Sequence, residues 1–348
     1  MSAREALLAE ADKRILLFDG AFGTQIQDRR LCGADYSGQL GLSADQQGNN
    51  DLLALTRPDV IADITLAYLQ AGSDIVSTNT FSANRISQAD YGAEGLVAEV
   101  NRVSAGIARK LADQLTAATG RRRFVAGAIG PTNKTLSLSP RVEDPGFREI
   151  DFDFLSSVYR EQADALVKGG ADFILVETIF DTLNAKAAIC AVRELEREIG
   201  SEIPIMLSMT LTDLSGRNLS GHTVEAFWHS VRHARPLAVG LNCSFGAEQL
   251  RPHLQVLSGC ADTLLLAYPN AGLPNELGEY DEEPETTAAH LREWAEAGRV
   301  NILGGCCGST PAHIAAIARA IEGLPPRSPP RSAPTMHLAG LEPFTMAA

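Results

Sequence analysis

The sequence predicts an α/β fold, a single (β/α)8 TIM barrel with long loops on the C-terminal face of the barrel. Short apolar, β-branched-rich runs of strand length recur eight times along the 348 residues, and segments with helical spacing of apolar residues separate them. The runs are continuously apolar instead of alternating, which is typical of parallel strands buried on both faces. A single lead-in strand and eight repeats favour closure into a barrel over an open doubly wound sheet.

Each expected strand is an Ile-, Leu-, Val- or Phe-rich run that ends at glycine or a polar residue. The last helix is the most clearly marked, because Ser309 and Thr310 offer a hydroxyl cap and Pro311 occupies its first turn. The expected strands cover residues 15–20, 75–79, 124–131, 173–178, 205–210, 237–243, 263–268 and 300–305. The expected helices cover residues 59–71, 94–116, 152–168, 182–198, 224–233 and 311–321.

Three long connections interrupt this rhythm at residues 28–50, 132–151 and 270–285. All three follow strands, so in a barrel they fall on the C-terminal face, where barrel enzymes build their active sites. The segment 324–334 is Pro-rich and is expected to be a stiff, extended linker. We therefore expect a barrel domain over residues 1–323 and a Pro-rich linker or tail over residues 324–348.

The composition excludes several classes of partner. The net charge is −13 and no long basic stretch is present, so neither nucleic acid nor a membrane surface is an expected partner. No apolar run reaches the ~18 residues of a transmembrane helix, and residues 1–14 lack a signal-peptide core. Six cysteines in a chain this long do not indicate a disulfide framework. We expect a cytoplasmic protein with reduced thiols.

Two adjacent cysteines, Cys306 and Cys307, lie between glycines at the end of the eighth expected strand. Their Cα atoms are only ~3.8 Å apart across a trans peptide, whereas disulfides usually span ~4.4–6.8 Å, so a shared metal ion suits the pair better. Cys243 ends the sixth strand in a similar context, and alternate strands contribute to the same barrel layer. Three thiolates would leave tetrahedral zinc with an open position, which marks a catalytic site. The alternative is that these small residues only pack at a crowded barrel rim.

A zinc ion held by three thiolates carries a net charge of −1, which makes it a poor Lewis acid for producing hydroxide. It suits a further thiol better, because coordination strongly favours the thiolate form. The bound thiolate would stay electron-rich and attack an electrophilic carbon. The sequence thus predicts S-alkylation instead of hydrolysis.

Two carboxylates end expected strands, Asp19 on the first and Glu177 on the fourth. The loop after Asp19 begins with Gly20 and Ala21, whose backbone N–H groups can approach a ligand closely. Together the two carboxylates are candidates to hold a substrate ammonium group while the loop amides take its carboxylate. Asp-Gly is also a common turn, so Asp19 has an alternative structural interpretation.

Three asparagines, Asn79, Asn242 and Asn270, also end expected strands and could form a neutral hydrogen-bonding wall or only turn the chain. Asn270 is the candidate whose amide oxygen would occupy the zinc when substrate is absent. His229 and His233 have the i, i+4 spacing of a zinc-protease pair, but the glutamate of that motif is missing. We expect these two histidines on a solvated helix face.

Four segments together give the chain a resemblance to the zinc-dependent homocysteine S-methyltransferases. The resemblance covers about residues 10–322 and implies a TIM barrel, zinc on Cys243, Cys306 and Cys307, and homocysteine held near Asp19 and Glu177. The segments are Leu-Phe-Asp-Gly-Ala-Phe-Gly-Thr at 17–24, Thr-Asn-Thr-Phe at 78–81, Gly-Leu-Asn-Cys at 240–243 and Gly-Gly-Cys-Cys-Gly at 304–308.

Within that family, further segments at 50–58, 130–135, 268–274 and 338–343 are most similar to the homocysteine-binding domain of cobalamin-dependent methionine synthase. The folate- and cobalamin-binding modules of that enzyme, and its Asp-x-His-x-x-Gly signature, have no counterpart in this sequence. The resemblance therefore implies a homocysteine-activating module that makes methionine with methylcobalamin on a cobalamin- and folate-binding partner chain, the methyl group coming ultimately from 5-methyltetrahydrofolate. A chain cut at the junction with the folate domain would look the same. The alternatives are a stand-alone homocysteine methyltransferase using S-methylmethionine or betaine, and a non-catalytic zinc-storing or redox-sensing barrel.

Overall fold

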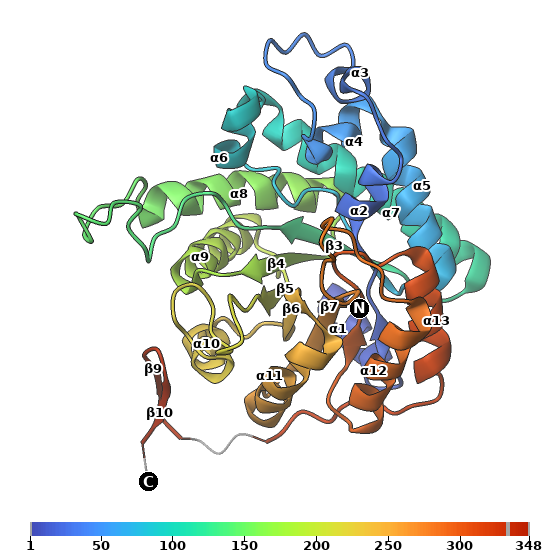
Figure 1. The fold of residues 1–348 in the computed structure, drawn as a ribbon, viewed down its shortest axis with the longest axis vertical. Coiled ribbons are helices and arrows are strands. Elements are labelled where there is room, and N and C mark those ends of the chain that lie inside the picture. The colour runs from blue at the N-terminus through green and yellow to red at the C-terminus, as the bar shows by residue number, and fades with distance from the viewer. Residues whose placement is uncertain (1, 332–334, 347–348) are drawn as a thin grey trace. The chain divides into compact units, whose positions relative to one another are not determined.

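A computed structural model describes residues 2–331 and 335–346, and its eight main strands form one parallel sheet. The strand order is β1-β8-β7-β6-β5-β4-β3-β2, with helices outside the sheet (Figure 1). This arrangement is a nearly closed (β/α)8 barrel, which confirms the predicted fold. The strands are β1 (Leu16–Leu17), β2 (Ile75–Ser77), β3 (Phe124–Ile129), β4 (Phe173–Ile179), β5 (Ile205–Met209), β6 (Ala238–Gly246), β7 (Leu264–Asn270) and β8 (Ile302–Leu303).

All six expected helices are present, with ends that differ by a few residues from the prediction. The sequence did not predict α1, α11 and α12, nor the short helices α2, α3, α4 and α6. Pro252 lies inside α11 and obscures its helical pattern, while Pro284 opens α12, which buries few large apolar residues. The helices are α1 (Ala3–Ala11), α2 (Phe22–Gln27), α3 (Gly33–Ser37), α4 (Leu53–Thr56), α5 (Pro58–Ala71), α6 (Arg85–Gln88), α7 (Val97–Thr119), α8 (Phe152–Gly169), α9 (Thr182–Ile199), α10 (Val224–Val231), α11 (Ala247–Cys260), α12 (Pro284–Glu296) and α13 (Pro311–Ile321).

By its internal contacts the chain divides into two compact units. The first comprises residues 1–21, 177–182 and 205–348, and the second comprises residues 22–176 and 183–204. In the first unit, parallel pairing aligns Ala238 of β6 with Leu264 of β7. Trp228 and Trp294 are fully buried in that unit. In the second unit the long helices α7 and α8 pack against each other.

The C-terminal segment is fastened to the first unit at two places. Arg327 is buried, and its guanidinium donates hydrogen bonds to the carbonyl oxygens of Ser258 at 2.9 Å and Thr263 at 2.8 Å. Further on, β9 (His337–Ala339) and β10 (Pro343–Thr345) form an antiparallel hairpin beside α10. The sequence analysis did not anticipate this hairpin. The expected domain boundary after residue 323 stays a prediction, and residues 332–334 of the expected linker lie outside the described part.

The hairpin is held by polar contacts to the segment before α10. The Thr223 amide donates to the carbonyl oxygen of Leu341 at 3.1 Å. Arg217 donates to that same oxygen at 3.4 Å and forms an ion pair with Glu342. The side chains of Leu338, Leu341 and Phe344 nevertheless stay exposed.

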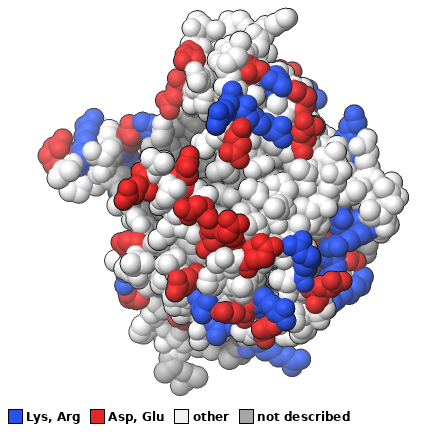
Figure 2. Space-filling view, turned by 45° about the vertical axis from the view of Figure 1, so that its right-hand side comes forward, with Lys and Arg blue, Asp and Glu red and all other residues white. Residues whose placement is uncertain are grey.

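The surface of the described residues agrees with the acidic composition. On the face shown in Figure 2, acidic side chains gather near the centre and basic side chains lie in separate smaller groups. Across residues 2–331 and 335–346, no helix combines the length and the apolar character that a bilayer crossing requires.

Candidate metal centre and substrate site

The cysteine loop that follows β8 is fixed to the end of β7 by backbone hydrogen bonds. The amide of Cys306 donates to the Pro269 carbonyl at 2.7 Å, and the amide of Ala271 donates to the Cys307 carbonyl at 2.9 Å. Glycine is required at position 305, because a Cβ atom there would lie 2.1 Å from the Ser309 hydroxyl oxygen. The Gly-Gly-Cys-Cys-Gly pattern is thus the local chemistry of a tight loop that presents two thiols.

The three predicted cysteines meet at this loop. The Sγ atoms of Cys243, Cys306 and Cys307 all lie within 4.8 Å of one another, and those of Cys243 and Cys307 are 3.9 Å apart. A tetrahedral zinc ion with Zn–S bonds of ~2.3 Å implies sulfur separations of ~3.8 Å. In the described part of the chain this is the one group of three or more Cys, His, Asp or Glu side chains close enough to share a metal ion, and Cys32, Cys190 and Cys260 lie outside it.

Proton sharing within the cluster makes the three thiols unequal. A hydrogen bond from the Cys243 thiol, followed by one from Cys306, lowers the pKa of Cys307. The same network raises the pKa of Cys306, with its bond to Cys243 as the largest cause. A cation at the centre of the cluster would favour the thiolate form of all three cysteines.

Tyr280, which the sequence analysis missed, covers the outer side of this cluster. Burial, followed by the neighbouring Cys307, raises the pKa of its phenol. Gly308 has a φ of +79° and leaves room for the tyrosine, because a Cβ atom there would lie 2.3 Å from the Tyr280 Cβ. The signal was weak, since Tyr280 lies in a long polar loop with no strand to position it.

The backbone around Cys243 is unusual. Cys243 and Ser244 have φ values of 61° and 62°, and Thr178 has a φ of 56°, although none of them is glycine. A left-handed conformation costs such residues on the order of 1–3 kcal/mol each and persists only where surrounding structure holds it. One supporting contact joins the hydroxyl oxygens of Ser244 and Thr210 at 2.8 Å.

Asn242 provides most of the remaining support. Its side-chain oxygen accepts hydrogen bonds from the Ser208 hydroxyl at 2.6 Å and the Thr178 amide at 3.1 Å, and its nitrogen donates to the Thr178 hydroxyl at 2.9 Å. The side-chain amide of Asn242 is fully buried, and its hydrogen bonds to Ser208 and Thr178 hold the backbone of the site in place. The predicted contact of Asn242 with substrate stays a prediction. Thr178 and Ser208 are positioning residues that the sequence analysis did not identify.

Both predicted carboxylates belong to the same unit as the cysteines. Glu177 accepts a hydrogen bond from the Tyr268 hydroxyl at 3.0 Å. Burial, reinforced by the neighbouring charge of Asp19, raises the pKa of Glu177 to about 7. Asp19 is buried, and its backbone oxygen accepts a hydrogen bond from the Gly305 amide at 3.0 Å, which places it beside the cysteine loop. Gly20 and Ala21 follow directly in the chain.

The two other asparagines differ. Asn270, at the end of β7, is buried, and within the described residues its side-chain oxygen has no hydrogen-bond donor. Since buried oxygens almost always have a partner, this atom is available for a ligand or a cation. Asn79 belongs to the second unit. Its side-chain nitrogen donates to the Asn50 carbonyl at 2.7 Å, and its backbone N–H donates to the Ser104 hydroxyl at 2.9 Å.

Comparison with known proteins identifies the family. The family model described as homocysteine S-methyltransferase matches residues 16–321. The chain belongs to the homocysteine S-methyltransferase family. Family membership makes it a methyltransferase and sets aside the non-catalytic alternative.

Solved structures from this family share the fold. The metallated form of the homocysteine methyltransferase MmuM from Escherichia coli has a TM-score of 0.71 and 25% identity, covering 91% of this chain and 99% of MmuM. The oxidised form of MmuM has the same TM-score with 24% identity, covering 92% of this chain and 99% of MmuM.

Proposed function

We propose that this methyltransferase activates homocysteine at a zinc ion held by Cys243, Cys306 and Cys307 and converts it to methionine. The observation that carries the proposal is the three-sulfur cluster, whose 3.9 Å separation between Cys243 and Cys307 suits one tetrahedral ion. Zinc bound there would favour loss of the proton from the homocysteine thiol and keep the sulfur nucleophilic.

The chain's own residues would bind and orient the amino acid. The carboxylates of Glu177 and Asp19 supply negative charge for the substrate ammonium group, and the amides of Gly20 and Ala21 are available to its carboxylate. Among the described residues the side-chain oxygen of Asn270 has no hydrogen-bond donor, which supports the proposal that this oxygen binds zinc until homocysteine replaces it. The new S–C bond then forms as the methyl group's bond to its donor breaks, and that bonding pair leaves with the donor.

For the donor we propose methylcobalamin on a cobalamin- and folate-binding partner chain. The support is the similarity of the segments at 130–135 and 268–274 to cobalamin-dependent methionine synthase. A small donor such as S-methylmethionine or betaine is the second candidate, because the match along 99% of MmuM, a homocysteine methyltransferase, does not distinguish the two classes of donor. We also propose a cytoplasmic location, because the thiol cluster needs reducing conditions and all six cysteines are free.

The deciding experiment measures methionine formation by zinc-loaded protein with homocysteine and one donor at a time. Methylcobalamin, S-methylmethionine and betaine are compared in parallel at equal concentration. Turnover with methylcobalamin alone is the expected result. Turnover with a small donor alone would replace the first candidate by the second, and absence of turnover with every donor in protein that holds zinc would contradict both.

A further inference from the structure

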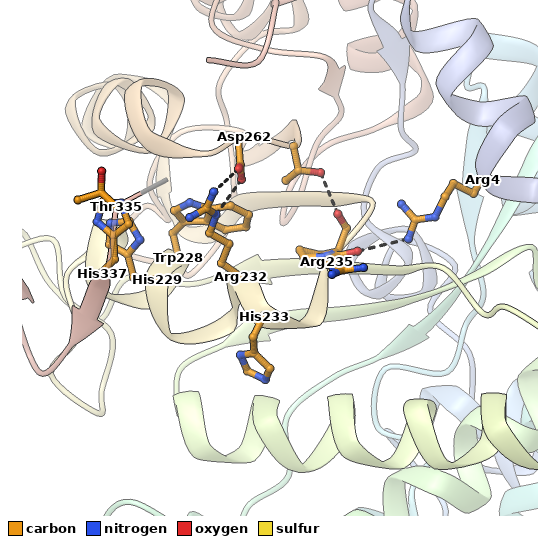
Figure 3. Close-up of a pocket in the computed structure, with 11 residues that line it drawn as sticks. Arg4, Trp228, His229, Arg232, His233, Arg235, Asp262, Thr335 and His337 are labelled. Atoms are coloured by element: carbon orange, nitrogen blue, oxygen red, sulfur yellow. Dashed lines mark hydrogen bonds and ion pairs between the residues drawn. The ribbon is translucent and has the colours of Figure 1, made fainter. Parts of the chain in front are cut away.

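A cavity of about 690 Å³ lies in the first unit, lined by residues that the proposed reaction does not use. It is formed by α10 and the turn after it, the residues just before β6 and β7, Arg4 of α1, and the segment leading into the C-terminal hairpin. Its volume is within the ~300–1,000 Å³ that small-molecule sites occupy. Figure 3 shows its lining side chains spread along the cavity from Thr335 and His337 to Arg4.

The lining is strongly basic although the whole chain is acidic. Three of the eleven lining residues are arginines, three are histidines and one, Asp262, is acidic, whereas the net charge of the chain, with histidine counted as neutral, is −13. Asp262 is already occupied, since it forms a two-point ion pair with Arg232. The basic residues are Arg4, His229, Arg232, His233, Arg235 and His337.

Arg235 is the clearest cation without a partner. In the described part of the chain no hydrogen bond or ion pair engages its guanidinium, whereas its backbone oxygen accepts a bond from Arg4 at 3.3 Å. That bond ties the Arg4 side chain to the Arg235 backbone. A guanidinium presents its N–H groups in a planar fork that matches carboxylate and phosphate oxygens.

Buried polar atoms at the other end of the cavity also lack partners. Among the described residues, the indole nitrogen of Trp228 and Nδ1 of His229 make no hydrogen bond, whereas Nε2 of His229 lies 3.6 Å from a carboxylate oxygen of Glu225. The His229 side chain is only 4% exposed, so the expectation of a solvated helix face is wrong for His229, whereas His233 is exposed as expected. Its ring stacks on His337 of the hairpin with centroids 4.2 Å apart. Such buried groups seldom stay unsatisfied without an unobserved ligand or water.

We propose that this cavity binds a compact polyanion with two or more phosphate or carboxylate groups. One anionic group meets Arg235 and Arg4, and another reaches the donors of Trp228 and His229. Because Thr335 and His337 belong to the C-terminal segment, the bound anion also holds the hairpin against α10.

The test is calorimetric titration of the full chain with tripolyphosphate and with tricarballylate, at constant ionic strength because salt screens such contacts. Arg235→Gln is the test variant and Arg30→Gln the control, since both arginines are exposed and share a φ of 48°. Removing one charged hydrogen-bond partner should weaken binding about tenfold or more in Arg235→Gln and leave Arg30→Gln unchanged. The stronger of the two probes identifies the anionic group that the cavity prefers.

Hydrogen exchange in residues 335–346 gives a second readout. The bound anion should slow exchange of the hairpin amides in the unmodified protein and in Arg30→Gln, but much less in Arg235→Gln. Three results would overturn the proposal: absence of saturable heat with both probes, equal binding by Arg235→Gln and the unmodified protein, or equal losses in both variants. Equal losses in both variants would mean that the anion is attracted by the overall charge of the surface and binds at no defined site.

Discussion

The thiols of Cys243, Cys306 and Cys307 differ from the other three cysteines in having each other as neighbours, so each of the three should be necessary for the proposed zinc binding. A metal ion shared by three side chains loses most of its affinity when one side chain is removed, because the remaining two no longer complete the coordination shell. The barrel itself should not depend on the thiols, since Cys306 and Cys307 lie in the loop after β8 and Cys243 lies in the C-terminal half of β6.

Cys307→Ser should therefore reduce zinc content to less than about a tenth of the stoichiometric value while leaving the circular dichroism spectrum unchanged. Elemental analysis of purified protein after dialysis measures the zinc. The matched control is Cys190→Ser in α9, which should keep its zinc. Retention of one zinc per chain by Cys307→Ser would move the metal site elsewhere.

Glu177 should make ligand binding depend on pH. Its pKa is raised to about 7, so the carboxyl is largely protonated below that pH and becomes a carboxylate above it. Attraction for a substrate ammonium group should thus strengthen as pH rises through 7. Methionine is the better probe, because it lacks the thiol that titrates near ~8.5 in homocysteine.

Methionine affinity should accordingly rise between about pH 6 and 8 in the unmodified protein. Glu177→Gln should bind methionine about tenfold more weakly at pH 8 and show a flat profile. Zinc content serves as the control, since Glu177 is not a proposed ligand. An unchanged methionine affinity in the variant would remove Glu177 from the substrate site.

At the residue scale, the sequence predicts those groups whose position follows from a strand end. Cys243, Cys306, Cys307 and Glu177 all follow apolar runs, and the structure brings the three thiols together. Tyr280 could not be found in this way, because its placement depends on the path of a long loop. The hydrogen bonds of the buried Asn242 side chain could not be predicted either, because its partners Thr178 and Ser208 come from other strands.

Among the elements, the hairpin of β9 and β10 depends on few contacts. Arg217 supplies two of them, through the carbonyl of Leu341 and the carboxylate of Glu342. Exposed ion pairs contribute only ~0–1 kcal/mol, so each contact is weak alone. The hairpin should consequently open without unfolding of the barrel.

Arg217→Gln should accelerate amide exchange in residues 337–345 by about three- to tenfold and leave exchange in β6 and β7 unchanged. Hydrogen exchange followed by mass spectrometry resolves both regions. Arg85→Gln provides the control, because Arg85 forms a comparable exposed pair with Glu161 in the second unit. Equal acceleration in both variants, or none, would contradict the role of Arg217.

The elements themselves were predictable to different degrees. Continuous apolar runs and clear caps made the strands and helices such as α8 and α13 readable from the sequence. The hairpin was not readable, because its strands have three residues each and pair only when α10 is beside them. A Pro-rich segment leading to it suggested an extended linker instead.

For the molecule as a whole, eight βα repeats were sufficient to predict the barrel, but not its division into two compact units. That division runs through β4, where no change in composition marks it. Arg327 is a further feature that composition could not reveal. This buried side chain lies in the Pro-rich segment after α13 and donates hydrogen bonds to the carbonyl oxygens of Ser258 and Thr263, near the end of α11.

Arg327→Met should lower the free energy of unfolding by about 2–4 kcal/mol, because several buried carbonyl groups lose their donor. Urea denaturation followed by tryptophan fluorescence measures the change, with Trp228 and Trp294 both in the first unit. Arg331→Met, an exposed position in the same segment, should shift the midpoint little. Equal shifts in the two variants would show that Arg327 acts only through the charge of the segment.

The left-handed backbone at Cys243 and Ser244 has an evolutionary consequence. Glycine or asparagine would fit both positions with less strain, so selection for stability alone opposes the residues found there. A lineage released from methyl transfer should lose this dipeptide early and gain thermal tolerance as it does so. Survival of the Cys-Ser pair in a descendant sequence would then be a sign that the catalyst is still in use.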